Sequence, residues 1–241
     1  DRCWYTATTG IWQNVWMEGI RGRKIEHALI TPDVDDKSAE IQLYFDQEIK
    51  EGLIEWELIY KDQFIKSGSF TVRGFRDKFK IHISEEDPID NLVHLWSPEN
   101  PNLYYLKLIL KINEQIQDEI QTYFGMRKIE RRGNRILLNN YPLYQKLILD
   151  QGYWPESLMT PPSSEALIKD LQLVKDMGFN GVRKHQKIED PRFYYYADIM
   201  GVLVWSEMPS MYEFHRKGVE ALTKEWMDII YRDYNHPSII T

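Results

Sequence analysis

Apolar and polar residues alternate along the first half of the chain in short segments separated by turn signals. This alternation predicts strands at residues 41–45, 53–60, 79–83, 103–112 and 119–124. A period of two with one polar face is typical of an antiparallel sheet whose other face is buried. Strands at this spacing predict a β-sandwich of about seven strands. The charged run at 48–51 and the two prolines within 97–102 predict turns.

A β-hairpin and a strand open the second half before the pattern becomes helical. Residues 123–140 predict a hairpin centred on residues 132–134, and residues 143–149 predict a strand. Ser163 or Ser164 is the expected N-cap of a helix that Gly178 ends. The apolar face of that helix is predicted from residues at helical spacing, which are Ala166, Leu167, Leu171, Val174 and Met177.

Strands and helices then alternate along the rest of the chain. Residues 179–183, 202–205 and 239–240 predict strands, and the second of these is apolar throughout, as buried parallel strands are. Asp190 and Pro191 open a helix that Gly201 ends, with proline at the first helical position, and residues 219–234 predict a third helix. This order predicts βαβ units and a parallel sheet, so we expect at least two domains.

Charge and composition narrow the class of protein. The 241 residues include 30 Lys or Arg and 37 Asp or Glu, a net charge of −7, whereas a nucleic-acid binder usually shows a basic patch or a high pI. The longest apolar runs are too short to span a membrane. A single cysteine, Cys3, excludes an intrachain disulfide framework and a cysteine zinc cluster. The aromatic content of 13% suits sugar stacking and a sandwich core equally.

Both ends of the chain look cut. The sequence begins at Asp1 without an initiator methionine or a signal peptide, and the apolar residues 239–240 resemble the first residues of a strand that continues. We therefore expect a piece of a longer protein. The alternative is a short natural tail that docks loosely.

Five segments, in this order, resemble the family 2 glycoside hydrolases, which include β-galactosidases, β-glucuronidases and β-mannosidases. Residues 9–18 (TGIWQNVWME) resemble the last strand of that family's sugar-binding jelly roll. Residues 95–104 (LWSPENPNLY) resemble a turn of its immunoglobulin-like sandwich. The other three segments resemble the bridge into its barrel and the second and fourth barrel strands: FGMRKI (124–129) with ILLN (136–139), FNGVR (179–183) and NHPSI (235–239).

This resemblance implies a multidomain chain that is all-β and then α/β. Residues 1–19 would be the remnant of the jelly roll, residues 20–122 an immunoglobulin-like β-sandwich, and residues 123–241 an incomplete (β/α)8 barrel of about three βα units. It also implies that the parent protein is a retaining exo-β-glycosidase, which hydrolyses O-glycosidic bonds. In this family the acid/base glutamate ends barrel strand four and the nucleophile glutamate lies on strand seven. Both are therefore expected beyond Thr241, and residues 1–241 alone are expected to be inactive.

Two alternative functions stay open at this point. One is a non-catalytic carbohydrate-binding or scaffold protein with the same architecture. The other is an enzyme built around Glu207 and Asp150 of this chain alone, which would need a closed pocket.

Candidate substrate-binding residues follow the predicted barrel strands, because barrel active sites lie at the carboxyl ends of the strands. They are Asp150, Arg183, His185, Trp205 and Glu207. The resemblance implies that Arg183 helps to position nucleophile and substrate, and that Glu207 matches an acidic residue after strand three. It implies a substrate-binding position for Asp150. His185 could bind a sugar hydroxyl and Trp205 could stack on a sugar ring. A structural ion pair, a structural histidine, a buried core tryptophan and a salt-bridged carboxylate are the alternatives.

The chain departs from the family's pattern after Arg183. The better-known β-galactosidases continue with Ser-His-Tyr-Pro, whereas this chain continues with Lys184, His185, Gln186 and Lys187. Their substrate is therefore not carried over to this chain.

Expected partners follow from the same resemblance. A β-linked carbohydrate is the expected substrate, with no nucleic acid, no membrane and no required cofactor. Some family members bind Mg²⁺ or Na⁺, but these residues predict no metal ligand. An incomplete barrel leaves an open strand edge, through which we expect self-association. A single cysteine and the absence of an Asn-x-Ser/Thr sequon fit a bacterial protein of the cytoplasm or periplasm.

Overall fold

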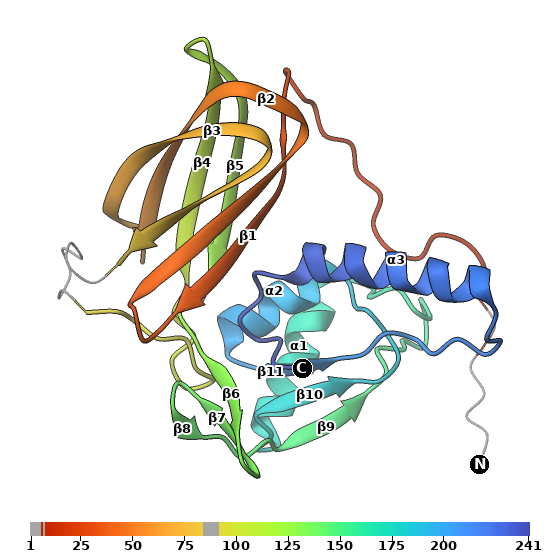
Figure 1. The fold of residues 1–241 in the computed structure, drawn as a ribbon. Coiled ribbons are helices and arrows are strands. Elements are labelled where there is room, and N and C mark those ends of the chain that lie inside the picture. Colours follow the sequence, from red (N-terminus) through yellow and green to blue (C-terminus); the bar gives the residue numbers. More distant parts are fainter. Residues whose placement is uncertain (1–5, 7, 84–91) are drawn as a thin grey trace. The chain divides into compact units, whose positions relative to one another are not determined.

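The computed structural model describes residue 6 and the ranges 8–83 and 92–241, which form mainly β-strands with three α-helices (Figure 1). The chain divides into two compact units. The five-stranded unit contains Glu18–Tyr144 and Met227–Pro237. The parallel-sheet unit contains Asp1–Met17, Gln145–Trp226 and Ser238–Thr241. The domain limits 1–19, 20–122 and 123–241 stay a prediction.

Five antiparallel strands form the main sheet of the five-stranded unit. They are β1 (Ile25–Asp33), β2 (Ser38–Tyr60), β3 (Gln63–His82), β4 (Tyr104–Ile112) and β5 (Gln115–Phe124). The order is β1-β2-β4-β5, and β3 also pairs with β2. Each segment predicted from alternation lies in or at the end of one of these strands, because period-two alternation places one set of side chains in the core.

The strands β2 and β3 are long enough to belong to two layers. Residues 38–45 of β2 pair with β1 and with residues 76–82 of β3. Residues 53–60 of β2 pair instead with β4 and with residues 63–71 of β3. Ile41 from the first part and Ile54 from the second belong to the same buried core. The sheet therefore folds over one core (Figure 1). The main sheet has five strands where the pattern predicted about seven, because β2 and β3 are long enough to belong to both layers.

The predicted turn at residues 48–51 is wrong. These residues lie inside β2, where the register shifts on both sides of Ile49. Glu48, Lys50 and Glu51 are exposed while Ile49 is buried. A β-bulge bends a strand without ending it, so the charged residues stay in water while the strand passes from one layer to the other.

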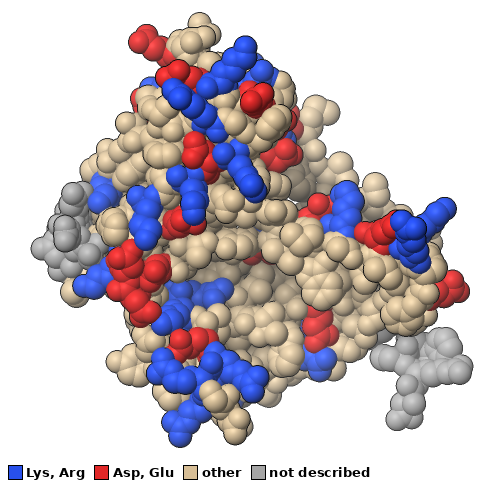
Figure 2. Space-filling model, viewed as in Figure 1, with Lys and Arg blue, Asp and Glu red and all other residues tan. Residues whose placement is uncertain are grey.

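Charged residues cover the outer surface of the strands. Lys78 lies 2.9 Å from Glu40, and Lys80 lies 3.0 Å from Asp36, across the β2–β3 pair. Exposed pairs of this kind contribute little to stability. On the face shown in Figure 2, basic and acidic side chains are interspersed, so that face carries no extended patch of one sign.

A small antiparallel sheet follows β5 in the same unit. It consists of β6 (Ile129–Arg132), β7 (Arg135–Leu138) and β8 (Tyr141–Pro142). Gly133, in the turn between β6 and β7, has φ +61°, a left-handed conformation that glycine adopts without strain. The predicted hairpin at residues 132–134 is confirmed.

Three parallel strands form the sheet of the other unit, in the order β11-β10-β9. They are β9 (Leu147–Asp150), β10 (Gly181–Lys184) and β11 (Leu203–Ser206). The helices α1 (Ser164–Asp176) and α2 (Pro191–Met200) connect them, and α3 (Arg216–Asp233) follows. Ile239 forms an isolated parallel bridge with Val204, so the strand predicted at 239–240 is present as a single bridge to β11. No helix in the described ranges is both long and apolar enough to cross a membrane.

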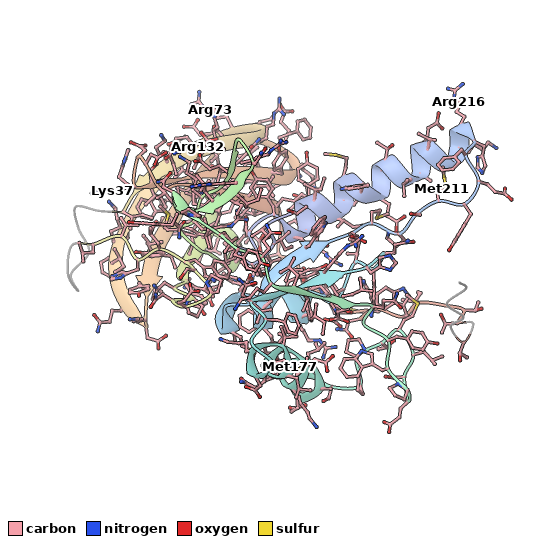
Figure 3. All side chains as sticks on the ribbon, turned by 90° about the horizontal axis from the view of Figure 1, so that it is seen from below. Lys37, Arg73, Arg132, Met177, Met211 and Arg216 are labelled. Carbon is pink, nitrogen blue, oxygen red and sulfur yellow. The ribbon has the colours of Figure 1, made fainter. Side chains whose placement is uncertain are left out.

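The helix ends follow their sequence signals. The side chain of Ser163 accepts a hydrogen bond from the amide of Ala166, and Asp190 accepts one from Arg192. Gly201 ends α2 with φ +69°. Met177 is 58% exposed and follows α1 at its C-cap (Figure 3), so its predicted place on the buried face is wrong.

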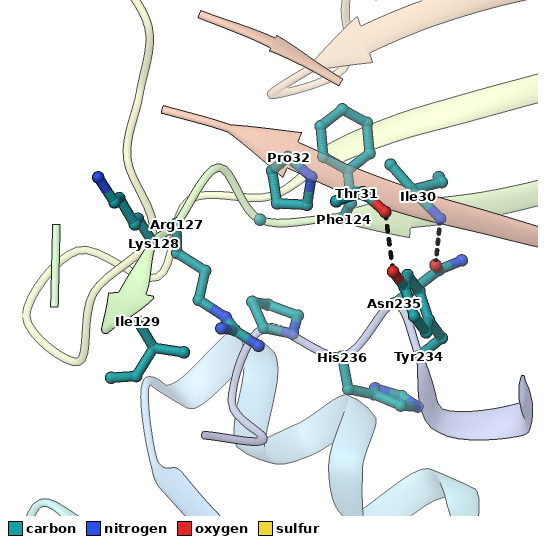
Figure 4. Close-up of a pocket in the computed structure, with 12 residues that line it drawn as sticks. Ile30, Thr31, Pro32, Phe124, Arg127, Lys128, Ile129, Tyr234, Asn235 and His236 are labelled. Atoms are coloured by element: carbon teal, nitrogen blue, oxygen red, sulfur yellow. Dashed lines mark hydrogen bonds between the residues drawn. The ribbon is translucent and has the colours of Figure 1, made fainter. Parts of the chain in front are cut away.

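Asn235 links two edge strands of the five-stranded unit (Figure 4). Its Oδ1 accepts a hydrogen bond from the amide of Ile30, 2.8 Å away, and its Nδ2 donates to the carbonyl of Ala28 at 2.8 Å, both in β1. Nδ2 also lies 3.2 Å from Oγ1 of Thr122 in β5. One amide side chain thus satisfies backbone groups that an edge strand would otherwise leave without a partner.

The residues on either side of Asn235 also pack on this unit. The Tyr234 hydroxyl lies 2.8 Å from Oγ1 of Thr31, and Nδ1 of His236 lies 3.0 Å from the Tyr123 hydroxyl. A Cβ added to Gly125 would approach Pro237 to 2.8 Å, so only glycine fits beside this proline. The segment 234–237 is therefore held by side chains and by close packing.

Candidate functional site at the carboxyl ends of the parallel strands

The carboxyl ends of β9, β10 and β11 meet at one edge of the parallel sheet. Lys184 is in register with Asp150 of β9 and with Ser206 of β11, and Arg183 is in register with Trp205. All five candidate residues therefore come to the same edge. Side chains alternate between the two faces of each strand, so residues that are neighbours in sequence point to opposite sides.

One face of the sheet is covered by helices. Ile148, Val182 and Val204, one from each strand, share a buried core with residues of α1 and α2. Alternation places Lys184 on this helix-covered face and Arg183 on the other face. The exposure agrees, because Lys184 is buried while Arg183 is exposed.

Arg183, Trp205 and Glu207 come together on the open face. Nε of Arg183 donates to Oε1 of Glu207, and the amide of Gln186 donates to Oε2 at 3.2 Å. The guanidinium carbon of Arg183 lies 5.3 Å from the centre of the Trp205 ring, within the range of a cation–π contact. This ion pair and ring form the Arg183 cluster. Arg183 lies in β10 and Glu207 directly follows β11, so both lie at the carboxyl ends of adjacent parallel strands, as the sequence predicted.

The charge of Glu207 is set by opposing effects. Its burial alone would raise the pKa, but the hydrogen bonds from Arg183 and from the amide of Gln186 outweigh it and hold the pKa below its ordinary value of 4.5. His185 adds a smaller electrostatic contribution in the same direction. Glu207 is therefore a carboxylate anion at neutral pH.

We expect the Glu207 carboxyl to titrate below pH 4.5 in a ¹³C NMR titration. Because the pKa of Glu207 is lower in the folded chain than in the unfolded chain, the charged carboxylate stabilises the fold at any pH above the pKa of the unfolded chain. That stabilisation is lost as the pH falls through the pKa of the folded chain. The variant Arg183→Gln should move the titration of Glu207 to higher pH. A midpoint at or above pH 4.5 in the unsubstituted chain would contradict the lowered pKa.

Asp150 belongs to a different group of charges, on the helix-covered side. Its Oδ2 lies 2.7 Å from Nζ of Lys184, which also lies 2.8 Å from Oε2 of Glu189. Lys187 lies 3.0 Å from Oε1 of Glu189 and donates to the carbonyls of Gly152 at 2.5 Å and Met159 at 2.8 Å. We call Asp150, Lys184, Lys187 and Glu189 the buried charge cluster.

The two lysines of the buried charge cluster respond differently to burial. Burial lowers the pKa of Lys184, but the charges of Asp150 and Glu189 outweigh it, so the pKa is raised overall. Burial lowers the pKa of Lys187 and its contact with Glu189 does not compensate. Removing charges from water is costly unless they are paired, so Lys184 is the lysine whose charge this cluster neutralises best.

His185 lies between the two groups. Its amide donates to the carbonyl of Asp150 at 2.9 Å, and its Nδ1 lies 3.3 Å from Nε2 of Gln151. It therefore sits at the same edge of the sheet and connects the loops after β9 and β10. A role in binding a sugar hydroxyl stays a prediction, as do the binding roles of Arg183, Trp205, Glu207 and Asp150.

The sequence reading missed Lys184, Lys187 and Glu189. The sequence did contain a signal for these residues. A charged run directly follows a buried strand, and Lys184, two positions after the buried Val182, points to the same face of the strand. A charged side chain on a buried face needs a charged partner. In the described residues, no group of three or more His, Cys, Asp or Glu side chains is placed to hold a metal ion.

The extended segment before the first strand also reaches these loops. Oγ1 of Thr160 donates to the carbonyl of Trp12 at 2.8 Å, and Nε2 of Gln13 donates to the carbonyl of Ile188 at 3.0 Å. Nζ of Lys187 lies 4.9 Å from the centre of the Trp12 ring. The segment thus covers part of the buried charge cluster with an aromatic side chain.

Comparison with known proteins gives a consistent result. Residues 23–127 match the model for Glycosyl hydrolases family 2. A putative beta-glucuronidase from Formosa agariphila is 28% identical over 96% of this chain and 28% of its own length. A beta-galactosidase from Photobacterium profundum is 27% identical over 96% of this chain and 24% of its own length.

Solved structures agree with these relatives. A beta-glycosidase from Bacteroides vulgatus matches with a TM-score of 0.76 and 26% identity, over 91% of this chain and 29% of that protein. A beta-glucuronidase from Bacteroides uniformis has the same fold, with a TM-score of 0.74 and 19% identity over 91% of this chain and 28% of its own. The chain spans less than a third of the length of each of these four proteins. Residues 23–127 thus match the model of glycoside hydrolase family 2, and the chain as a whole is similar to part of longer beta-glucuronidases and beta-galactosidases.

Proposed function

We propose that the chain supplies a substrate-binding wall to a retaining exo-β-glycosidase. In this proposal residues 20–122 form an immunoglobulin-like sandwich and residues 123–241 form about three βα units of a (β/α)8 barrel. The acid/base and nucleophile glutamates lie outside residues 1–241. The observation that carries the proposal is the Arg183–Glu207 pair at the carboxyl ends of adjacent parallel strands in a chain similar to members of this family.

Glu207 is suited to holding Arg183 rather than to donating a proton. A general acid of a glycosidase needs a raised pKa, whereas the pKa of Glu207 is lowered. A retaining mechanism also needs two carboxyls about 5–5.5 Å apart, one to protonate the leaving oxygen and one to attack the anomeric carbon. Asp150 is bound to Lys184 on the other face. These contacts argue against an enzyme built on Glu207 and Asp150 alone.

We expect Arg183 to contact the substrate or the nucleophile carboxylate. Its contact with Glu207 uses Nε, and a guanidinium has further nitrogens that can bind a sugar hydroxyl or a second carboxylate. Beside a nucleophile carboxylate, this positive charge would keep that carboxylate ionised at neutral pH. The Trp205 ring, whose centre lies 5.3 Å from the guanidinium carbon, helps to hold Arg183 through the cation–π contact.

The test uses the natural gene product that contains residues 1–241. We expect it to hydrolyse an aryl β-galactoside or β-glucuronide, the substrate classes in the relatives' names, with retention seen by NMR. Arg183→Lys should lower kcat/KM about 10²-fold, because a misplaced substrate loses alignment with the reacting groups. The control is Arg216→Gln, because Arg216 is an exposed residue at the start of α3 (Figure 3). It should leave kcat/KM unchanged.

Other outcomes would overturn parts of this proposal. An inverted product would contradict the mechanism, and turnover by residues 1–241 alone would contradict the placement of both glutamates. A frame that ends at codon 241, together with sugar binding but no turnover, would favour a non-catalytic carbohydrate-binding or scaffold protein.

In the described chain β9 pairs with β10 alone, which supports the expected self-association through this edge.

A further inference from the structure

Gln151 and His185 form a hydrogen-bonded pair at the carboxyl edge of the parallel sheet. Nε2 of Gln151 lies 3.3 Å from Nδ1 of His185. Gln151 follows the last residue of β9 and His185 follows the last residue of β10, and the amide of His185 donates to the carbonyl of Asp150 at 2.9 Å. The loops after two neighbouring strands are thus joined by a backbone bond and by a side-chain bond. Both residues of the pair are half-buried, so part of each stays accessible to a ligand.

The pair lies near the Arg183 cluster. Gln186, the residue after His185, donates its amide to Oε2 of Glu207 at 3.2 Å. Gln186 has φ +52°, a left-handed conformation that residues other than glycine seldom adopt, so the chain turns sharply after His185. His185 is also among the groups that lower the pKa of Glu207, and a charge acts strongly only at short distance. The imidazole and the Arg183 cluster therefore belong to one polar surface.

The hydrogen bond within the pair determines which of its atoms are left for a ligand. Gln151 donates through Nε2, so Nδ1 of His185 accepts and the neutral imidazole carries its hydrogen on Nε2. The pair then offers one N–H donor, at Nε2 of His185, and one carbonyl acceptor, at Oε1 of Gln151. Among the described residues, neither of these two atoms has a hydrogen-bond partner.

A donor beside an acceptor is complementary to a hydroxyl group, which both donates and accepts. A carboxylate can only accept and an ammonium can only donate, so either would leave one polar atom of the pair without a partner, which costs free energy in a half-buried site. Arg183 adds further donors to the same surface, because its bond to Glu207 uses only Nε. This surface is suited to a neutral ligand that carries several hydroxyl groups.

We propose that Gln151 and His185 together bind one ring hydroxyl of the glycoside, and that the enzyme selects substrates that carry this hydroxyl. Nε2 of His185 donates to the hydroxyl oxygen, and Oε1 of Gln151 accepts the hydroxyl hydrogen. This inference rests on the proposed glycosidase function and extends the substrate-binding surface from Arg183 to Gln151.

The first test examines the imidazole of His185 by ¹⁵N NMR in residues 1–241, at a pH where the ring is neutral. We expect its hydrogen on Nε2. Gln151→Glu replaces the amide donor by a carboxylate, which only accepts, so Nδ1 should gain a hydrogen. Gln172→Glu is the matched control, because Gln172 is exposed on α1 and bonds to Asp176. A hydrogen on Nδ1 in the unsubstituted chain, or an imidazole that does not respond to Gln151→Glu, would overturn the pair.

The second test measures kcat/KM of the natural gene product that contains residues 1–241. The substrates are an aryl β-galactoside, an aryl β-glucuronide and analogues of each that lack one ring hydroxyl. In Gln151→Leu, the ratio of kcat/KM between the complete substrate and one of these analogues should fall about tenfold or more, because the variant no longer distinguishes them. The ratios for the other analogues should not change. His185→Phe should affect the same analogue, and Gln172→Leu should affect none.

The outcomes separate this inference from the proposed function. Turnover with unchanged ratios in Gln151→Leu would overturn this inference alone. No turnover of either glycoside would overturn the proposed function and this inference with it. If Gln151→Leu does not fold, Gln151→Glu keeps the size of the side chain and should change the same single ratio.

Discussion

Replacing Lys184 with methionine is expected to lower the free energy of unfolding by about 3–5 kcal/mol. Lys184 is 2% exposed, and its ammonium lies between the carboxylates of Asp150 and Glu189. Methionine keeps most of the volume but removes the positive charge. Two carboxylates would then stay in the buried charge cluster with less compensation, and this cost exceeds that of losing a surface ion pair.

Urea unfolding of residues 1–241 at pH 7 measures this loss. Lys169→Met is the matched control, because Lys169 is exposed on α1 and methionine is also a good helix former. It should change the free energy of unfolding by less than about 0.5 kcal/mol. Equal losses in the two variants would show that the charge of Lys184 is unimportant.

Replacing Gly152 with alanine is expected to cost more than about 3 kcal/mol, through backbone strain and a clash together. Gly152 has φ +58°, in the left-handed region. An added Cβ would lie 2.2 Å from Oε2 of Glu189, 2.8 Å from Nζ of Lys187 and 3.0 Å from Nζ of Lys184. The methyl group would therefore have to displace a carboxylate that is held by two ammonium groups in a buried site.

Gly133→Ala separates these two causes. Gly133 has φ +61°, but an added Cβ there would meet nothing within 4 Å. That variant should lose only the cost of the left-handed backbone, about 1–2 kcal/mol. Urea unfolding followed by circular dichroism compares the two variants. If both lose the same free energy, the close packing of Gly152 against the buried charge cluster contributes nothing.

Local signals predicted much of the fold. The N-caps Ser163 and Asp190, the end of α2 at Gly201 and the turn at Gly133 all depend on residues close in sequence. The same local reasoning failed at residues 48–51, because a charged run in a turn and a charged run in a bulged strand look alike. Only the pairing partners on β3, which are distant in sequence, distinguish them.

The candidate site shows the same limit. The sequence brought Arg183 and Glu207 to one edge, because the carboxyl ends of parallel strands coincide. It did not separate Asp150 from them, since the face on which a side chain lies depends on the register of three strands and on the partner it finds there. The bond from Asp150 to Lys184 joins two such strands, and a residue-by-residue reading of motifs does not include it.

The contact between Asn235 and Ile30 has a consequence for the timing of synthesis. The two residues are 205 positions apart, so at about 5–20 residues per second the ribosome needs roughly 10–40 s to make Asn235 after Ile30. During that interval all five strands of the main sheet can leave the ribosome while β1 still presents an uncapped edge. Exposed edges of this kind pair with other chains. The nascent protein is therefore most prone to aggregation on polysomes before residue 235 emerges, and a chaperone that covers β1 would protect it in that interval.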